Sequence, residues 1–217
     1  MITYEQVKKD QSIRTYIKAA DASLAALGYT EHSFAHVTKV SEDAAEILRA
    51  VGADERTVEL AMIAGYMHDI GNLVNRSEHS QSGAVMAFRI LDKMGMDADE
   101  IATVVTAIGN HDEGTGVPVN DVAAALILAD KSDVRRTRVR NSDFSTFDIH
   151  DRVNYSVESS ELTVKDGLIS LSLKIDTTIS SLIDYFEIFL TRMTLCRRAA
   201  DTLGMAFRLS INGQQYI

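Results

Sequence analysis

The chain has 217 residues and is 46% hydrophobic, which suffices for one substantial core and excludes a disordered or low-complexity chain. Its formal charge of −9 argues against general nucleic-acid binding, because such binding neutralises phosphates with Lys and Arg. The longest apolar runs, such as residues 122–129, are far shorter than the roughly 18 residues of a membrane span, and the charged start of the chain has no signal-peptide pattern. We therefore expect a cytoplasmic protein with one main domain and no membrane association.

The first two-thirds of the chain predict successive helices, because apolar residues recur at three- and four-residue spacing between capping residues and glycines. The expected helices are residues 4–27, as one helix or two, closed by Gly28; 33–51, ended by Gly52; a third capped by Asp54 and running to Asp69; a fourth capped by Ser77 and ending near Gly95; a fifth starting with a capping box of Asp97 and Glu100; and a sixth after Asn120 that continues to Arg136.

After about residue 150 the pattern becomes alternating. Residues 152–164 and 167–176 alternate polar and apolar side chains, and Asp166-Gly167 between them is a turn signal, so we predict a β-hairpin. A helix over 178–203 and a short strand over 206–211 follow. We predict a mainly α protein with a helical domain over 1–150 and a small α/β appendage over 151–217 packed on it. We recognise no chemistry in the appendage.

Histidines and carboxylates gather near the ends of the predicted helices. Five of the six His residues lie in four short segments that loops could bring around one cavity. The His-Asp dipeptide occurs three times and by itself proves little. Asp69 and Asp130, however, each follow a nearly all-apolar stretch, where an ionised carboxylate is costly unless it is paired or bound to a metal. We expect both carboxylates to face a cation.

The ligand types available restrict the metal. The single cysteine, Cys196, allows neither an intrachain disulfide nor a thiolate zinc site, so nitrogen and oxygen must hold any metal. Imidazole and carboxylate suit one or two divalent ions of Fe, Mn, Zn, Co, Ni or Mg. A carboxylate between two groups of His can bridge two ions roughly 3.5–4 Å apart, and such a pair serves the hydrolysis of phosphate esters or anhydrides.

On these residues the sequence resembles the HD-domain metal-dependent phosphohydrolase superfamily over residues 33–136. HVTKVSEDAAEIL resembles the family's first segment, AGYMHDIGN its His-Asp pair and LILADKSD its last segment. EHSQSGAVMAFRIL and AIGNHDEGTG resemble segments that add His ligands in members with two metals, as in the dinucleoside-tetraphosphate hydrolases and the cyclic-di-GMP phosphodiesterases. The resemblance implies a helical bundle, the catalytic pair His68 and Asp69 with Asp69 as the bridge, and these metal ligands: His36, His68, Asp69, His79, His111 and Asp130.

The chain departs from the family's pattern at some positions. Many members carry Lys or a carboxylate where this chain has Asn72, which puts proton transfer or substrate contact there in doubt. The cyclic-di-GMP branch has two adjacent His and a later Gly-Tyr-Pro, whereas this chain has Asn110 in place of one His and Val117 in place of Tyr. These departures weaken the cyclic-di-GMP interpretation.

Basic residues near Asp130 are candidates for substrate binding. Lys131, Arg135 and Arg138 have the spacing i, i+4 and i+7, so a continuing helix would place them on one face, where they could bind phosphates; a solvated helix face explains them equally well. His32 precedes His36 by one turn and could face the same cavity, where it would meet a substrate phosphate or orient a ligand; an ordinary polar residue at a helix start explains it equally well.

The sequence offers two candidate proton donors and one further His-Asp pair. Asp112 and Glu113 are candidates to protonate the leaving group, and the pair His150-Asp151 is taken as structural.

The expected partner is a small phosphorylated compound, with a nucleotide as first candidate. A homodimer is also considered, and we expect no binding of duplex nucleic acid. Two other classes stay open. The chain could be a metal- or nucleotide-binding signalling module with little hydrolysis, its appendage serving as a dimer or partner surface. An oxygenase with the same ligand set is a more distant alternative.

Overall fold

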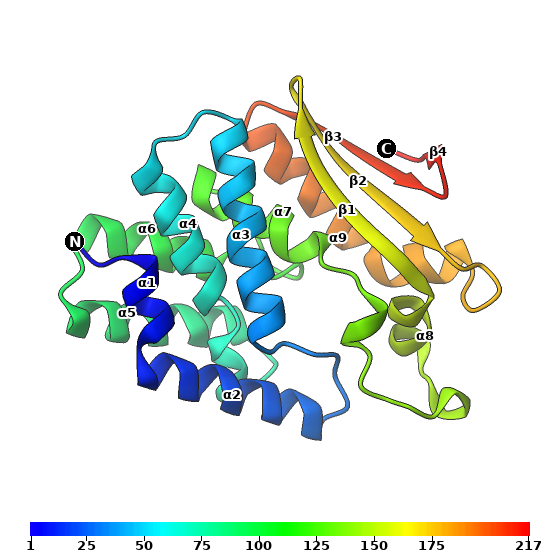
Figure 1. The fold of residues 1–217 in the computed structure, drawn as a ribbon, viewed down its shortest axis with the longest axis horizontal. Helices are drawn as coiled ribbons and strands as arrows, with labels where there is room; N and C mark the ends of the chain where they lie inside the picture. The colour runs from blue at the N-terminus through cyan, green and yellow to red at the C-terminus, as the bar shows by residue number, and fades with distance from the viewer.

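Helices form most of the chain up to residue 156, and a small sheet with one long helix follows (Figure 1). The computed structural model describes residues 1–217. None of its helices combines the length and apolar character that crossing a membrane requires. The helices are α1 (Tyr4–Lys9), α2 (Gln11–Ala26), α3 (Phe34–Ala50), α4 (Glu55–Met67), α5 (His79–Met94), α6 (Ala98–Gly109), α7 (Asp121–Ser132), α8 (Ile149–Ser156) and α9 (Leu182–Thr202), with 3-10 turns η1 (Ile70–Leu73), η2 (Arg136–Arg138) and η3 (Phe144–Thr146).

Side-chain caps start several helices where the sequence predicts them. The Asp10 carboxylate accepts hydrogen bonds from the first amides of α2, so the region 4–27 is two helices that meet at this residue. Ser33, Asp54 and Asn120 cap α3, α4 and α7 in the same way. These caps satisfy amides that have no partner within the helix.

Two predicted helix starts are wrong in detail. Ser77 does not cap α5, which begins at His79 after Glu78, a residue with φ of 57° in the left-handed region. Glu100 does not complete a capping box, because its carboxylate accepts a hydrogen bond of 2.7 Å from Nε of Arg56 on α4. At Glu100 a tertiary contact overrides the local signal.

Helix α7 runs through the centre of the molecule and ends earlier than predicted. All its residues except Asp121 and Asp130 are buried, as expected for a helix that is apolar on every side. It stops at Ser132, because the chain turns at Asp133 and continues in extended form through Arg135 into η2. The expected helix face shared by Lys131, Arg135 and Arg138 is therefore wrong.

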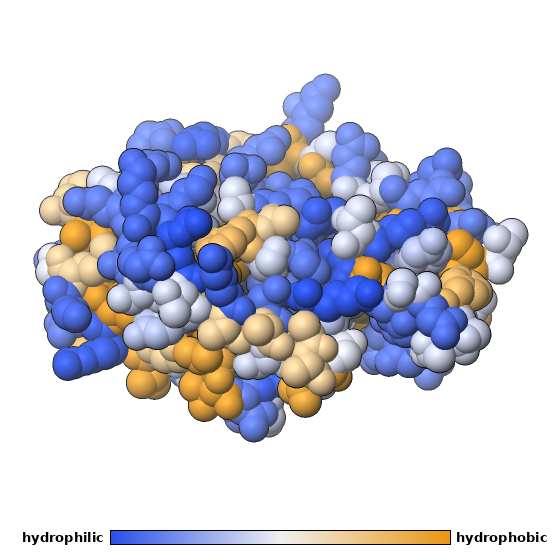
Figure 2. Space-filling model, turned by 60° about the horizontal axis from the view of Figure 1, so that its bottom comes forward, coloured by the Kyte–Doolittle hydropathy of each residue, from blue (hydrophilic) through white to orange (hydrophobic).

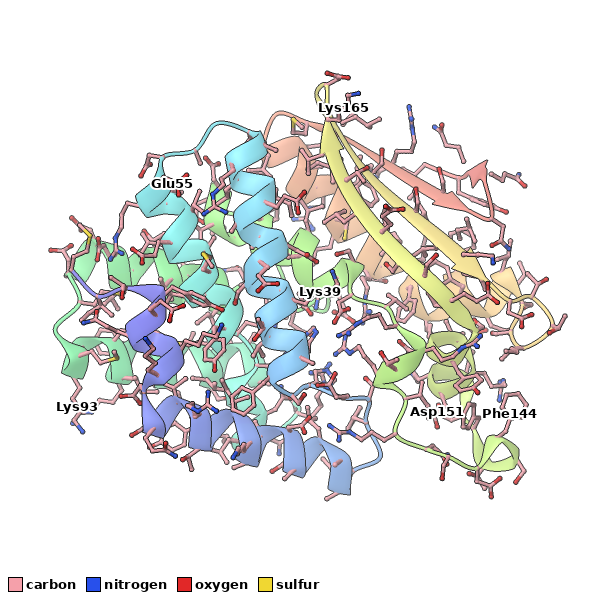
Figure 3. All side chains as sticks on the ribbon, in the orientation of Figure 1. Lys39, Glu55, Lys93, Phe144, Asp151 and Lys165 are labelled. Carbon is pink, nitrogen blue, oxygen red and sulfur yellow. The ribbon has the colours of Figure 1, made fainter.

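The sheet has four strands in the order β1-β2-β3-β4: β1 (Val157–Lys165), β2 (Leu168–Ile175), β3 (Ala206–Ile211) and β4 (Gln214–Gln215). Strands β1 and β2 form the predicted antiparallel hairpin, with Asp166 and Gly167 both at positive φ in its turn. Residues 152–156, predicted as part of the first strand, instead end α8, whose start Asp148 caps through the amide of Asp151. Lys165 marks the hairpin turn in Figure 3.

The appendage predicted from the sequence packs on the helices through α9. This helix joins β2 to β3, which pair in parallel, and it contacts both the sheet and α7 (Figure 1). Buried side chains of the sheet and of α9 belong to one continuous core with those of α3, α4 and α7. The predicted fold class, a helical bundle with a small α/β appendage, is thus confirmed, while a domain boundary at residue 150 stays a prediction.

The exterior is mostly hydrophilic. Figure 2 shows hydrophilic residues over most of one face, with hydrophobic residues exposed in small groups. Exposed apolar side chains such as Val85, Phe88 and Ile183 are present, as on most protein surfaces.

Candidate metal centre

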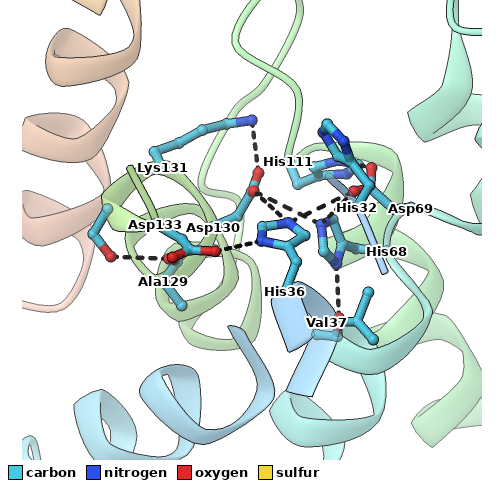
Figure 4. A network of polar contacts seen from close by, with 12 residues as sticks. His32, His36, Val37, His68, Asp69, His111, Ala129, Asp130, Lys131 and Asp133 are labelled. Atoms are coloured by element: carbon cyan, nitrogen blue, oxygen red, sulfur yellow. Dashed lines mark hydrogen bonds and ion pairs between the residues drawn. The ribbon is translucent and has the colours of Figure 1, made fainter. Parts of the chain in front are cut away.

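The six predicted ligands lie together at or near the ends of five helices, and all of them except His79 are labelled in Figure 4. Each comes from a first turn, a last turn or one of the two residues after a helix, where a side chain can reach a cavity between helices. All four His residues and Asp69 have less than 7% of their surface exposed. The ligands come from α3, from the segment joining α4 to η1, from α5, from the end of α6 and from α7: His36, His68 with Asp69, His79, His111 and Asp130, respectively.

The first group of donors surrounds one oxygen of each carboxylate. Nε2 of His36 lies 3.6 Å from Oδ2 of Asp69 and 3.4 Å from Oδ1 of Asp130. Nε2 of His68 lies 3.2 Å and 3.7 Å from the same two oxygens. Two imidazole nitrogens and two carboxylate oxygens thus face a common point, and His36, His68 and Asp130 offer ligand atoms close enough to hold one ion.

The second group faces the other oxygen of Asp69. Oδ1 of Asp69 lies 3.5 Å from Nε2 of His79 and 4.0 Å from Nε2 of His111, and these two nitrogens are 3.2 Å apart. Asp69 therefore stands between the two groups and presents one oxygen to each. This is the arrangement that a bridging carboxylate requires.

The imidazole rings are held so that Nε2 points into the centre. In each ring Nδ1 lies within hydrogen-bond distance of an oxygen that can only accept: the Asp133 carboxylate for His36, at 2.7 Å, and backbone carbonyls for His68, His79 and His111, at 2.7, 3.1 and 2.6 Å. Nδ1 must therefore carry the proton, which leaves the lone pair on Nε2 free to bind a metal.

Unpaired polar atoms show that the centre fits a metal ion. Nε2 of His36 and Nε2 of His68 are buried and have no hydrogen-bond partner. Buried polar atoms without partners are costly and rare in folded proteins. Nitrogen and oxygen donors without thiolate are the ligands of the divalent ions named above.

Electrostatics keep both carboxylates ionised. Burial would raise the pKa of Asp69, but the neighbouring imidazoles, with His68 foremost, hold it well below its usual value. Burial likewise opposes ionisation of Asp130, and Lys131 lowers its pKa well below the usual value. Burial lowers the pKa of His111 well below its usual value, so this ring is neutral at pH 7. Two anionic carboxylates beside a neutral imidazole favour a cation between them.

Two residues orient the ligands. Asp133 is buried, and besides accepting from His36 it pairs with Arg135 through Nε at 2.5 Å. The side-chain amide of Asn72 donates to Oδ1 of Asp69 at 2.9 Å and to its backbone carbonyl at 3.0 Å. Asn72 therefore positions Asp69. No role was predicted for Asp133 from the sequence, although it lies three residues after Asp130.

A cavity of about 390 Å³ opens beside the ligands. Of the predicted substrate-binding residues, His32, Lys131 and Arg138 line it. The position of the Arg138 guanidinium is fixed, because it donates hydrogen bonds to the backbone carbonyls of Asp133 and Glu31. Arg135 does not line the cavity, because it extends back to Asp133.

Several residues on the cavity wall were not predicted from the sequence as part of the site. Arg76 lies 3.3 Å from Nε2 of His79 through its guanidinium. Arg192 comes from α9, in the appendage for which no chemistry was expected. His150 and Asp151, taken as structural, also line the cavity; Asp151 is labelled in Figure 3. No local motif marks these positions, because only packing of distant segments brings them here.

The loop carboxylates do not fit the expected role of proton donor. Glu113 pairs with Lys131 at 2.7 Å and with Arg192 at 3.1 Å. Burial opposes its ionisation, yet these two cations hold its pKa far below the usual value, so it has no proton to give at pH 7. Asp112 does not line the cavity.

One family model and two known proteins match parts of this chain. The model of the HD domain family matches residues 33–135, which include all six residues of the centre and Asp133. An uncharacterized protein of Methanocaldococcus jannaschii is 26% identical over 188 residues, covering 76% of this chain and 71% of its own. The crystal structure of a predicted HD superfamily hydrolase from an uncultured Thermotogales bacterium is similar with a TM-score of 0.46 and 26% identity, over 62% of this chain and 75% of that chain.

The family match and the cluster of His and Asp residues concern the same part of the chain. Residues 33–135 match the HD domain family, and this range contains every His and Asp residue of the centre.

Proposed function

We propose that this protein hydrolyses a small phosphate ester or anhydride, with a nucleotide as first candidate, using two divalent metal ions. The observation that supports it most is the position of Asp69 between two groups of imidazole nitrogens. His36, His68 and Asp130 would hold one ion with Oδ2 of Asp69, and His79 and His111 would hold the other with Oδ1. Bound ions would polarise a phosphoryl oxygen and make water more acidic.

The chain's own groups prepare the site for an anionic substrate. Lys131 is buried at the cavity, and its ammonium group is held 2.7 Å from Oδ2 of Asp130. Arg76, Arg138 and Arg192 bring further positive charge to the same walls. Buried cations in a cavity attract phosphate more strongly than exposed ones, because water screens them less.

The proposal is tested first by elemental analysis of protein purified without chelator and without a nickel column. We expect two metal ions per chain, falling to one or none in Asp69→Ala and His111→Ala. His150→Ala is the matched control, because His150 lies on the cavity wall but belongs to neither group of clustered metal-ligand atoms, and its metal content should equal that of the wild type.

Turnover is then measured on a panel of nucleoside phosphates and simple phosphate esters. Hydrolysis that disappears in His68→Ala and Asp69→Ala supports the enzyme. Two bound metals and tight nucleotide binding without turnover would instead favour the signalling module, and a protein that also refuses added Mn or Fe would contradict the metal centre.

A further inference from the structure

Three charged side chains form a cluster on the cavity wall beside the metal centre, which we call the Glu113 cluster: Glu113, Lys131 and Arg192. Oε2 of Glu113 lies 2.7 Å from Nζ of Lys131, and Oε1 lies 3.1 Å from the guanidinium of Arg192. Nζ of Lys131 also lies 2.7 Å from Oδ2 of Asp130. The cluster thus begins at a predicted metal ligand and extends across the cavity to the appendage.

The two cations are built into helices and retain unused donors. Lys131 lies in the last turn of α7, with 5% of its side chain exposed. Arg192 lies in the middle of α9, its guanidinium 4.2 Å from the centre of the Phe189 ring, and its Nε is buried with no hydrogen-bond partner. A buried guanidinium nitrogen without an acceptor is costly. This side chain therefore has capacity for an additional oxygen ligand.

The anion of the cluster is less firmly held than its cations. Glu113 belongs to the loop between α6 and α7 rather than to a helix, and 27% of its side chain is exposed. Its carboxylate is the one group that neutralises Arg192. A carboxylate presents two oxygens to a guanidinium much as a phosphate does, so either anion satisfies the same donors.

We propose that Lys131 and Arg192 form a binding subsite for a phosphoryl group, and that Glu113 occupies this subsite until a phosphate displaces its carboxylate. The role of the subsite in substrate binding rests on the proposed phosphohydrolase function. Helix α9 of the appendage thereby completes the site, since the HD domain supplies Lys131 and Glu113 but not Arg192. The ligand is the phosphoryl group of an ester, an anhydride or free phosphate.

The test is calorimetric titration of the full chain with inorganic phosphate, using protein as purified. We expect Glu113→Gln to bind phosphate on the order of tenfold more tightly, because the competing charge is gone while the side chain keeps its shape. Arg192→Ala should bind on the order of tenfold more weakly, and Arg192→Lys should fall between Arg192→Ala and wild type, because it keeps the charge without the planar fork. Arg197→Ala, an exposed arginine on the same helix, should match the wild type.

The sign of the Glu113 effect separates the proposal from a merely structural role. If Glu113 only held the two cations in place, Glu113→Gln would weaken phosphate binding, and that result would overturn the proposal. Unchanged affinity in Arg192→Ala would overturn it too.

The metal content of every variant is measured in parallel. A metal-loaded, active chain whose phosphate affinity ignores Arg192 contradicts the subsite alone. A metal-free chain that shows the expected order of affinities contradicts the hydrolase and leaves an anion-binding site.

Discussion

At the scale of single residues, the centre depends on the residues that hydrogen-bond to its ligands as much as on the ligands themselves. The clearest case is His36, whose Nδ1 donates to Asp133 at 2.7 Å. Asp133 is completely buried, and Arg135 and Arg138 lie within 4 Å of its carboxylate, so its charge is held in place. An anionic acceptor on Nδ1 makes Nε2 a better electron donor to a metal.

Replacement of Asp133 by Asn tests this dependence. Asp133→Asn keeps the shape and an acceptor oxygen but removes the charge behind His36, so we expect metal affinity to fall about 10- to 100-fold. Titration with Mn²⁺, followed by calorimetry, measures the change. Asp97→Asn is the control, since Asp97 caps α6 away from the centre and Asn caps a helix equally well. Equal affinities in the two variants would show that Asp133 has no part in ligation.

At the scale of elements, one close contact sets the distance between the His-Asp pair and His79. Turn η1 follows Asp69 directly and packs against the first turns of α5. A Cβ added at Gly71 would overlap the carbonyl oxygen of His79 and come within 2.5 Å of the amide nitrogen of Gly83. Only glycine lets these two backbones approach so closely.

We therefore expect Gly71→Ala to destabilise the protein and to disturb the second group of ligands. Overpacking of this kind costs about 1–3 kcal/mol, which corresponds to a fall in Tm of about 2–4 °C per kcal/mol for a chain of this size. Thermal unfolding and metal content are the two measurements. Gly109→Ala serves as the control, because a Cβ there would lie 3.6 Å from Cβ of Ala84, an ordinary contact. A Gly71→Ala protein as stable as Gly109→Ala would refute the close contact.

At the scale of the whole molecule, buried residues from both sides of residue 150 belong to one core. Buried residues of α7, α9 and the sheet form one contiguous cluster, and α9 contacts both α7 and β3. We expect a single cooperative unfolding transition for the full chain, with equal calorimetric and van't Hoff enthalpies. Two separate transitions in differential scanning calorimetry would instead show that residues 1–150 and 151–217 are independent domains.

Metal binding should also stabilise the whole molecule, because its ligands come from five helices that only the folded chain brings together. Mn²⁺ at a hundred times its Kd would add about 2.7 kcal/mol to the free energy of unfolding. Differential scanning fluorimetry with and without Mn²⁺ should show a higher Tm in the wild type and little change in His68→Ala. An equal rise in both proteins would mean that the ion binds elsewhere.

Much of the fold was predictable because its signals are local. Helix starts at Ser33, Asp54 and Asn120 and the Asp166-Gly167 turn act within a few residues, so the sequence states them directly. Predictions failed where a distant partner competes for a local group. Glu100 left its capping role for Arg56, 44 residues away.

The same division holds for the site. The sequence by itself determined which side chains could ligate a metal, since residue type and order are what the HD-domain resemblance uses. Only the tertiary structure decided which residues stand behind and around them, because those contacts join segments far apart in the chain. Asp133 meets His36 across 97 residues, and Arg192 meets Glu113 across 79. No local pattern encodes such pairs, because their free energy comes from burial and charge that exist only after the helices have packed.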